Sequence, residues 1–465
     1  MIAWSLPEIA GIVDGVVHDD PDGVVVTGPA FIDTRTPESG GLFAAFVGEN
    51  ADGHDHARAA VDAGAVAILG SRPVGVPAVV VGDVQAALQS LAAELLRRLR
   101  AGGTISVLAL TGSQGKTSTK DLLARILAAQ APTVATAGSF NNEIGLPLTV
   151  LRADAATRFL VLEMGSRGIG HLRELCEIAP PDVSVVLNVG LAHLGEFGSR
   201  ENIALAKGEL VEALTDAGVA VLNLDDPRVA AMRERTSARV IGFTEQDEAQ
   251  SGAGPDDIRV TGLEVDAFDR ASFSLEQAGV RAQVRLQILG RHQASNAAAA
   301  AAAATAVGVS LPDVAAALSE VTALSRWRME LTERDDGLVV INDAYNANPD
   351  SMRAALHTLH DIGQRAGRRT IAVLGEMREL GPAAADEHAA VGDLADTLGI
   401  DQVLVVGVEA AAIGGNVTHH VASVTDALDW LRQNVLRDDV VLVKASRGAR
   451  LERVADGLLE EGGKR

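Results

Sequence analysis

The sequence predicts an α/β fold made of several domains with parallel sheets. Short apolar runs alternate with helical stretches along most of the chain, which is typical of parallel strands covered by helices. The chain has 465 residues, too many for a single hydrophobic core, so two or three domains are expected. Hydrophobic residues make up 47% of the chain, a share that excludes wholesale disorder.

The charge balance and the cysteine count exclude several classes of protein. The formal net charge of −22 argues against a general nucleic-acid binder, which needs a basic face. The single cysteine, Cys176, excludes an intramolecular disulfide and a cysteine-rich zinc site. The N-terminus lacks a basic region before an apolar core, and the alanine run at residues 297–304 is too short to span a bilayer. We therefore expect a cytoplasmic protein with no membrane insertion.

Residues 1–102 are expected to form a small α/β domain. The apolar pattern predicts strands at residues 23–26, 42–47, 65–69 and 78–81, and helices at residues 54–63 and 84–100. The loop FIDTR contains Thr34 and Arg35, which suit a bound carboxylate or phosphate, although an ordinary loop explains them as well. The stretch GENADGHDH at residues 48–56 fits either a metal site or a turn with a helix cap.

A glycine turn between a strand and a helix is the strongest functional signal. The apolar run at residues 105–110 predicts a buried strand, and a helix is predicted from about Thr117. Glycines let backbone N–H groups close on an anion, and the helix N-terminus adds partial positive charge. The lysine that follows suits phosphate, and the threonine hydroxyl suits Mg²⁺. Only Ser113 and Gln114 separate Gly112 from Gly115, where the common pattern has four residues. The flanking strand and helix nevertheless favour a nucleotide site over an incidental turn.

Residues 103–315 are expected to form a central domain around this turn, with later strands at residues 159–162, 183–189 and 219–223. Ligands of open parallel sheets bind at the carboxyl ends of strands. Glu163 lies at such an end and suits Mg²⁺, although a solvated glutamate is an equal explanation. His193 suits a metal, acid–base work or a structural role. Lys207 lies on a helical stretch, where a surface lysine is usual.

Residues 316–465 predict a doubly wound domain, with strands at residues 338–342, 370–374, 402–406 and 440–444. His292 and Asn296 stand at the start of the alanine helix, where they suit either capping or a ligand. Arg328 lies near the junction with the central domain and suits either a nucleotide phosphate or a surface pair with Arg326. Asp343 ends a strand and suits a ribose hydroxyl. Asp350 is expected to cap the helix that follows.

Several motifs then occur in the order found in one enzyme family. They are LTGSQGKTSTKD, GSFNNEIGLPLT, LEMGSRG, NVGLAHLGEFGS, AKGEL, GRHQASN, WRMEL and NDAYNANPDSM. Together they resemble the Mur ligases, the ATP-dependent amide-forming enzymes of peptidoglycan precursor synthesis, over nearly the whole chain. The phosphate loop alone is shared with folylpolyglutamate synthetases. The stretches NDAYNANPDS and residues 31–56 are similar to the members that add D-alanyl-D-alanine.

The resemblance implies three α/β domains. These are a UDP-substrate domain at residues 1–102, a central domain at residues 103–315 with a P-loop ATPase-type parallel sheet, and a C-terminal Rossmann-like domain at residues 316–465. It implies that ATP phosphorylates the terminal carboxylate of UDP-N-acetylmuramoyl-tripeptide. The amine of D-alanyl-D-alanine then attacks the acyl phosphate. ATP and Mg²⁺ are the implied cofactors, and a monomer is expected.

The same resemblance implies a role for individual residues. The implied catalytic residues are Lys116, Glu163, His193 and Lys207, of which Lys207 matches a lysine that is carbamylated in the family. The implied metal ligands are Thr117, Glu163, His193 and Lys207. The implied ATP contacts are Gly112, Ser113, Gln114, Gly115, Lys116, Thr117, Ser118, His292, Asn296, Arg328 and Asp343. The implied substrate contacts are Thr34, Arg35, Asn141, Asn142, Asn346 and Ser446.

Three other functions are weighed against this one: two amide ligases of the same superfamily and one protein of a different class, a non-catalytic scaffold. A ligase that adds the third amino acid should carry an Asp-Asn-Pro-Arg stretch near the C-terminal site, and the sequence has none. A folylpolyglutamate synthetase should lack the N-terminal uridine domain. A non-catalytic ATP-binding scaffold would need no Glu163, His193 and Lys207 together, and it would release no phosphate with any muropeptide and dipeptide.

Overall fold

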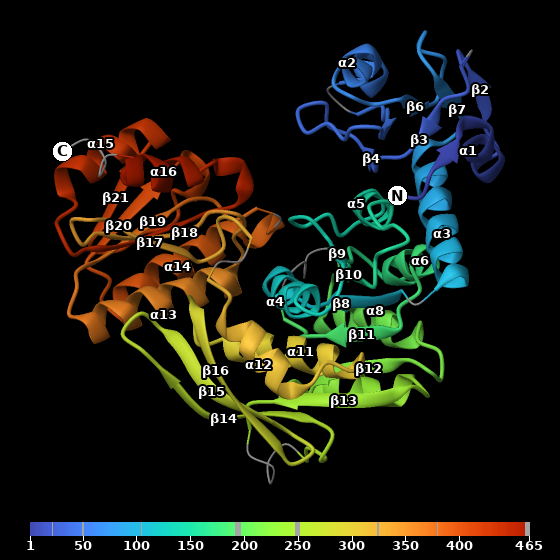
Figure 1. Cartoon of the computed structure of the whole chain (residues 1–465). Helices are drawn as coiled ribbons and strands as arrows, with labels where there is room; N and C mark the ends of the chain where they lie inside the picture. The colour runs from blue at the N-terminus through green and yellow to red at the C-terminus, as the bar shows by residue number, and fades with distance from the viewer. Residues whose placement is uncertain are drawn as a thin grey trace.

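The structure is a computed structural model of the chain, and it describes residues 1–20, 22–48, 51–103, 105–190, 197–246, 252–322, 325–378 and 380–460. The strands form an N-terminal, a central and a C-terminal sheet. In Figure 1 the N-terminal and C-terminal units both lie above the central unit. The expected α/β fold class with parallel sheets is therefore confirmed. Within the part of the chain that is described, each helix is too short or too polar to cross a membrane.

The N-terminal unit is built on a five-stranded sheet. Its strands are β2 (Val16–His18), β4 (Ala30–Phe31), β5 (Leu42–Ala44), β6 (Ala67–Gly70) and β7 (Ala78–Val80). The order is β2–β7–β6–β5–β4, in which β2 is antiparallel to β7 and the other pairs are parallel. A separate pair joins β1 (Trp4–Ser5) to β3 (Val25–Val26), and the unit's shorter helices are α1 (Leu6–Val13) and α2 (Ala57–Asp62).

Helix α3 (Val84–Gly102) joins the N-terminal unit to the central unit by packing as well as by sequence. The Asp83 side chain accepts hydrogen bonds from the backbone N–H groups of residues 85 and 86, which explains why the helix begins there. The apolar face of α3, with Leu88 and Leu95, shares one hydrophobic core with Leu146 and Leu172 of the central unit. This shared core fixes the N-terminal sheet relative to the central one.

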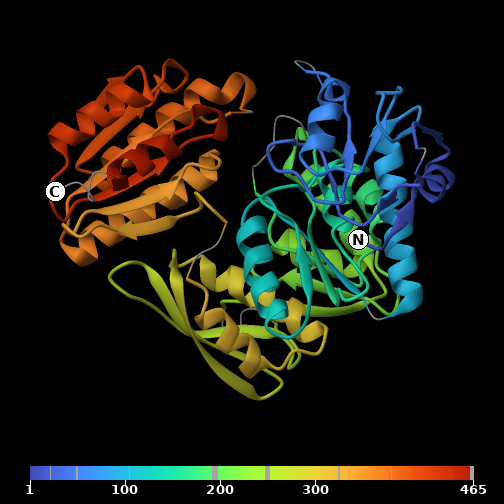
Figure 2. The same cartoon turned by 45° about the horizontal axis from the view of Figure 1, so that its top comes forward.

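The central sheet has nine strands. They are β8 (Ser106–Thr111), β9 (Thr133–Ala135), β10 (Phe159–Glu163), β11 (Val183–Val186), β12 (Val219–Asn223), β13 (Arg239–Thr244), β14 (Ile258–Val265), β15 (Arg270–Gln277) and β16 (Val280–Leu289). The order is β16–β15–β14–β13–β12–β11–β8–β10–β9. All pairs from β9 to β14 are parallel, whereas β14, β15 and β16 pair antiparallel. In Figures 1 and 2 this antiparallel extension reaches below the C-terminal unit.

Helices cover both faces of the central sheet. They are α4 (Lys116–Ala128), α5 (Gly145–Val150), α6 (His171–Ile178), α8 (Arg200–Glu212), α9 (Pro227–Ala230), α11 (Gln293–Ala306) and α12 (Leu311–Ser319). The alanine run lies within α11, and residues 297–304 are fully buried against the sheet and α4. Because alanine side chains are small, α11 can lie close to the phosphate-loop helix, which places its first turn beside the loop.

The C-terminal unit is a doubly wound six-stranded sheet. Its strands are β17 (Glu330–Glu333), β18 (Val339–Asp343), β19 (Thr370–Leu374), β20 (Gln402–Val406), β21 (Thr418–Val421) and β22 (Val440–Lys444). The order is β17–β18–β22–β19–β20–β21, and only the edge strand β17 is antiparallel to its neighbour among the strands described. Its helices are α13 (Pro349–Ala366), α14 (Ala384–Leu398), α15 (Val424–Asn434) and α16 (Glu452–Glu460), which bury one apolar core on each face of the sheet.

The expected cap of α13 is wrong. Asn348, and not Asp350, is the N-cap: its side chain accepts from the N–H of Ser351 at 2.8 Å, and the Ser351 hydroxyl accepts from the N–H of Asn348 at 3.0 Å. The residue before a proline favours an extended backbone, and proline suits the first helical position, so Asn348 and Pro349 set the start of the helix. Asp350 lies in the first turn instead, where its charge complements the helix dipole.

Candidate active site

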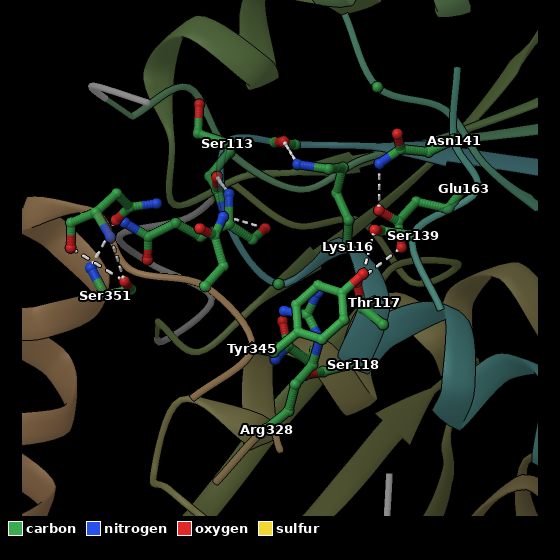
Figure 3. A pocket seen from close by; sticks show the side chains of 18 of the residues that line it. Ser113, Lys116, Thr117, Ser118, Ser139, Asn141, Glu163, Arg328, Tyr345 and Ser351 are labelled. Carbon is green, nitrogen blue, oxygen red and sulfur yellow. Dashed lines mark hydrogen bonds between the residues drawn. The ribbon is translucent and has the colours of Figure 1, made fainter. Parts of the chain in front are cut away.

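A cavity of about 730 Å³ lies where the central and C-terminal sheets face each other. The phosphate loop lines it together with the carboxyl ends of β10, β18 and β22, represented by Glu163, Asp343 and Lys444. His292, which precedes α11, and Ser351, in the first turn of α13, also line it. Figure 3 shows side chains from both units turned into this space. Ligands of open α/β sheets bind in this position, at the strand ends.

The phosphate loop runs from β8 into α4 and is held from two sides. Gly115 has a φ of +78°, which glycine adopts without strain. A Cβ atom at Gly115 would lie 2.5 Å from the Asn296 Oδ1, so a larger residue cannot occupy this position. On the other side, Asn188 accepts from the N–H of Ser113 through its carbonyl at 3.1 Å and from the N–H of Gln114 through its Oδ1 at 2.9 Å. The strap formed by these contacts fixes the loop before any ligand is bound.

Lys116 is the first residue of α4 and folds back over the loop. Its Nζ donates to the Gly112 carbonyl at 2.8 Å. Burial lowers the pKa of Lys116, the charge of Glu163 opposes that shift, and the charge of Arg328 adds to it. The three charged groups therefore lie within one electrostatic neighbourhood, which a phosphate group would complete.

Thr117 and Glu163 form a buried pair of oxygen ligands. The Thr117 hydroxyl donates to Glu163 Oε2 at 2.9 Å, and both side chains are almost fully buried. The Asn141 amide donates to Glu163 Oε1 at 2.7 Å, and the backbone N–H of Glu163 donates to the Thr136 hydroxyl at 3.0 Å. These contacts hold the carboxylate at the end of β10, facing the phosphate loop.

Lys207 is buried on α8 and lines the same cavity. Burial and the nearby charge of Lys116 lower the pKa of Lys207 well below its ordinary value. Among the residues that are described, no carboxylate offsets this shift, so the neutral amine is favoured. The predicted metal ligand His193 lies at residues 191–196, outside the described residues.

The C-terminal unit contributes a second group of side chains. The guanidinium of Arg328 lies 4.2 Å from the centre of the Tyr345 ring, as Figure 3 shows. Asp343 Oδ1 accepts from the N–H of Met329 at 3.1 Å, and Asp343 Oδ2 pairs with Lys444 Nζ at 2.5 Å. Lys444 also donates to the Asn346 carbonyl at 2.9 Å. The predicted phosphate and ribose contacts are thus side by side.

The two predicted ATP contacts near the start of α11, His292 and Asn296, differ in burial. His292 precedes the first turn of α11, lines the cavity and is exposed to it. Asn296 is buried, with its Oδ1 accepting from the Thr119 hydroxyl at 3.3 Å and its Nδ2 donating to Gln293 Oε1 at 2.8 Å. Asn296 therefore supports the phosphate loop, while His292 faces open space.

The predicted substrate contacts fall into two groups. Asn141, Asn142 and Asn346 line the cavity. Thr34, Arg35 and Ser446 are not part of its lining. The Arg35 side chain is 86% exposed and pairs with Asp33 at 2.6 Å. The buried Ser446 hydroxyl accepts from the N–H of Arg378 and donates to the carbonyl of Ala347 at 3.4 Å. The role of each of these residues in substrate binding stays a prediction.

In the histidine-rich stretch at residues 48–56, of which residues 49 and 50 lie outside the described residues, residues 52–56 form a capped turn. His54 is buried, its Nδ1 lies 2.6 Å from Asp52 Oδ1, and its Nε2 accepts from the N–H of Ser71 at 2.8 Å. Asp52 also accepts from the backbone N–H of His54 at 2.9 Å, as a helix cap does. No group of three or more histidine, cysteine, aspartate or glutamate residues that could hold a metal is found in the described ranges.

Sequence reasoning missed several side chains that complete the site. Tyr345 and Ser139 share a hydrogen bond of 2.5 Å across the two units, and Thr136 supports Glu163 from the loop that follows the edge strand β9. Tyr345 is the only tyrosine in the chain and stands among asparagines in NDAYNANP. A lone aromatic residue within a polar turn was the available signal.

Comparison with known proteins agrees with this geometry over most of the chain. Residues 31–109 match the Mur ligase family catalytic domain, residues 110–304 the Mur ligase middle domain, and residues 327–447 the Mur ligase glutamate ligase domain. The UDP-N-acetylmuramoyl-tripeptide–D-alanyl-D-alanine ligase of Mycobacterium tuberculosis is 45% identical, covering 99% of this chain and 98% of that protein. This chain belongs to the Mur ligase family.

Solved Mur ligase structures share the fold throughout. A crystal structure of MurF from Acinetobacter baumannii superposes with a TM-score of 0.83 at 32% identity, covering 98% of this chain and 99% of that one. The structure of MurF from Thermotoga maritima in complex with ADP has a TM-score of 0.78 at 29% identity, covering 95% and 99%. The expected Mur ligase architecture is therefore confirmed, and one of the solved members binds ADP.

Proposed function

We propose that this protein is an ATP-dependent ligase that joins D-alanyl-D-alanine to UDP-N-acetylmuramoyl-tripeptide. The product is the UDP-linked pentapeptide of peptidoglycan precursor synthesis. The observation that carries the proposal is the cavity, in which a phosphate loop meets Glu163, Lys207 and Arg328 from three other segments. The full-length relative from Mycobacterium tuberculosis carries the same activity in its name.

The reaction needs one phosphoryl transfer and one amide-forming attack. A carboxylate oxygen of the tripeptide attacks the γ-phosphorus of ATP, and ADP leaves. The dipeptide amine then attacks the acyl carbon, the bond from that carbon to the phosphate oxygen breaks, and the amine loses a proton. Lys116 and the loop N–H groups stabilise the charge of the transferring phosphoryl group. Arg328 adds a second positive charge from the C-terminal unit.

The nucleoside of ATP fits the surface between α11 and β18. Asp343 is placed to accept a ribose hydroxyl, in exchange for one of its contacts with Met329 and Lys444. His292 faces the space where a base would lie. Asn296 would act indirectly, by supporting the phosphate loop. Its amide oxygen accepts a hydrogen bond from Thr119 of α4 and fills the space beside Gly115.

The paired oxygens of Thr117 and Glu163 fit Mg²⁺. Hard divalent cations favour carboxylate and hydroxyl oxygens, and both atoms are buried beside the lysine that would face the phosphates. When bound, Mg²⁺ neutralises charge on the phosphate oxygens. Asn141 holds the second carboxylate oxygen, so Glu163 keeps one orientation during turnover.

Lys207 fits the role of a carbamylated lysine. Its neutral amine is the form that attacks carbon dioxide, forming an N–C bond and losing a proton. The product is a carboxylate-like anion that reverses the charge of the side chain. An anion beside Lys116 removes the repulsion between the two lysines. His193 would join this group as a metal ligand by family resemblance.

The acceptor side of the site extends from Asn141 and Asn142 toward the N-terminal unit. Thr34 and Arg35 would hold the uridine diphosphate there, far along the substrate from the reacting carboxylate. Asn346 and Ser446 are the proposed neighbours of D-alanyl-D-alanine. Each unit of one chain contributes to this set, so a monomer is expected to be competent.

Phosphate release with purified protein tests the proposal. ATP and Mg²⁺ are supplied with UDP-N-acetylmuramoyl-tripeptide, carrying lysine or diaminopimelate, and with D-alanyl-D-alanine, separately and together. Release only with both substrates, alongside a UDP-pentapeptide, is expected. The Lys116→Met variant should release less than about one hundredth as much, because removing a preorganised cation lowers the rate by a factor of about 100 or more.

The same assay distinguishes the rival functions. Release when a free amino acid replaces the dipeptide would indicate a different Mur ligase. An absence of release with every muropeptide and dipeptide would favour an ATP-binding scaffold. Near-normal turnover by Lys116→Met would contradict the assignment of the phosphate loop.

A further inference from the structure

Tyr345 contacts both halves of the site at once. Its backbone N–H donates to the Trp327 carbonyl at 3.2 Å, and its ring lies against the guanidinium of Arg328. The Arg328 Nε is buried and has no hydrogen-bond partner within the described residues, so the ring contact does much to orient this side chain. Trp327 and Met329, on either side of Arg328, have positive φ angles of +60° and +49°. Such left-handed backbone conformations of residues other than glycine are kept only where surrounding contacts hold them.

The other end of Tyr345 reaches the central unit. Its hydroxyl and the Ser139 hydroxyl share a hydrogen bond of 2.5 Å, which Figure 3 shows beside Thr117 and Glu163. Ser139 belongs to the loop at residues 136–142, which follows the edge strand β9. From below, the buried Lys120 of α4 donates to the Thr136 carbonyl of this loop at 2.7 Å.

The loop at residues 136–142 is joined directly to the end of β10 that carries Glu163. The Asn141 side chain donates to Glu163, and the Asn141 carbonyl accepts from the N–H of Gly165 at 2.8 Å. The Asn141 N–H in turn donates to the Ser139 carbonyl at 2.8 Å. A displacement of Ser139 would therefore be transmitted to the carboxylate through a single residue.

We propose that Tyr345 is a positioning residue that holds Arg328 with its ring and the loop at residues 136–142 with its hydroxyl. The nucleotide side and the acceptor side of the site are then assembled by the same side chain. This inference rests on the proposed ligase function for its kinetic consequences. The contact itself does not depend on that function and can be measured without it.

The kinetic test separates the ring from the hydroxyl. Tyr345→Phe keeps the ring and should raise the KM for UDP-N-acetylmuramoyl-tripeptide about two- to tenfold, the range expected for one hydrogen bond, with the KM for ATP unchanged. Ser139→Ala should have the same effect, and the double variant should be no worse than either single one. Ser139→Thr, which keeps a hydroxyl, should have a KM for UDP-N-acetylmuramoyl-tripeptide close to that of the parent protein. Tyr345→Leu, which removes the ring, should raise the KM for ATP as well.

Ser90→Ala is the matched control, because Ser90 lies on α3 and, in the described part of the chain, donates to the Ala86 carbonyl of its own helix alone. Its kinetics should equal those of the parent protein. Additive losses in Tyr345→Phe and Ser139→Ala, or unchanged kinetics in both, would overturn the positioning role. Failure of the parent protein to ligate would overturn the proposed function instead.

A spectroscopic test uses the single tyrosine. Protein grown with 3-fluorotyrosine carries the label at Tyr345 alone, so its ¹⁹F spectrum should contain one resonance. That resonance should shift in Ser139→Ala and stay in place in Ser90→Ala. An unchanged resonance in Ser139→Ala would show that the two hydroxyls do not meet in solution, and would overturn the inference. A shift without any change in KM would establish the contact and contradict the positioning role.

Discussion

At the scale of single residues, two lysines that line the cavity differ in their electrostatic surroundings. Lys116 keeps a hydrogen bond to the Gly112 carbonyl and remains beside the carboxylate of Glu163. Lys207 has no such compensation within the described residues, and its pKa falls further. Burial thus lowers the pKa of both lysines, and the charge of Glu163 opposes that shift at Lys116.

The lowered pKa of Lys207 predicts a dependence of stability on pH. In the unfolded chain this lysine binds a proton up to its ordinary pKa, whereas in the folded protein it releases the proton at a lower pH. The unfolded state thus binds more protons between these two values, so stability rises with pH across that window. In carbonate-free buffer, Lys207→Met should have a higher melting temperature than the parent protein at pH 7, and the difference should narrow as pH approaches 10. A constant difference across this range would contradict the argument.

Activity gives an independent check of the same residue. Lys207→Ala should lose more than about 99% of its turnover, since electrostatic groups at phosphoryl-transfer sites contribute factors of about 100 or more. A short carboxylic acid should restore part of it by supplying the missing anion. An active variant, or an inactive one that no acid rescues, would contradict the carbamate role.

At the scale of elements, the linker after α12 is fastened to the phosphate-loop helix. Asp121 lies on α4, and its Oδ2 accepts from the N–H of Ser325 at 2.8 Å and from its hydroxyl at 2.7 Å. Arg328 follows three residues later in the chain. Helix α4, which begins with Lys116, therefore also sets the position of Arg328.

Replacing Asp121 should weaken this coupling. Asp121→Ala removes two hydrogen bonds to a charged acceptor, so the KM for ATP should rise about three- to tenfold. It also removes the ion pair with the buried Lys120 at 2.7 Å, so the melting temperature should fall. The KM for D-alanyl-D-alanine should change less. Asp62→Ala is the control, because within the described residues Asp62 pairs with the exposed Arg58 of its own helix α2, at 3.2 Å, and with no group of the cavity. Equal kinetics in both variants would mean that the anchor does not position Arg328.

The sequence predicts elements better than it predicts contacts between them. The predicted strands at residues 370–374 and 440–444 are confirmed. They could be predicted because each contains an uninterrupted run of four apolar residues, at residues 371–374 and 440–443. The predicted cap of α13 is wrong because Asn348 and Asp350 are both suitable N-cap residues. Only the extended backbone before Pro349 decides between them. The Tyr345–Ser139 contact joins residues 206 positions apart, and no local pattern reveals such a pair.

Motif reasoning predicts the candidate site in the same uneven way. Strand ends of a parallel sheet share one edge, so Glu163 could be expected beside the phosphate loop. The local pattern alone does not predict that Lys207 points into the cavity, because a lysine on a helix is usually solvated. That Asn296 supports the loop, and does not simply face the cavity, depends on the close approach of α11 to Gly115.

At the scale of the whole molecule, the three units divide the proposed substrates between them. The cavity lies between the central and C-terminal units, whereas Arg35 lies in the N-terminal unit outside its lining. The core that α3 shares with the central unit fixes the distance between the two regions. A long substrate that is held at both ends fits this arrangement.

Arg35 tests the division between units. Arg35→Ala should raise the KM for UDP-N-acetylmuramoyl-tripeptide about tenfold or more, the loss expected for hydrogen bonds to a charged group, and leave the KM for ATP unchanged. Arg58→Ala is the matched control, being an exposed arginine of the same unit that also pairs with an aspartate. Unchanged kinetics in Arg35→Ala would place the uridine diphosphate elsewhere.

The central claim is that this protein activates the tripeptide carboxylate by phosphorylation before forming the amide. Tripeptide substrate labelled with ¹⁸O in both oxygens of its terminal carboxylate tests it directly, with mass spectrometry of both products. The account predicts one ¹⁸O in the released phosphate and one in the new amide carbonyl of the UDP-pentapeptide. Unlabelled phosphate, or no pentapeptide at all, would contradict it.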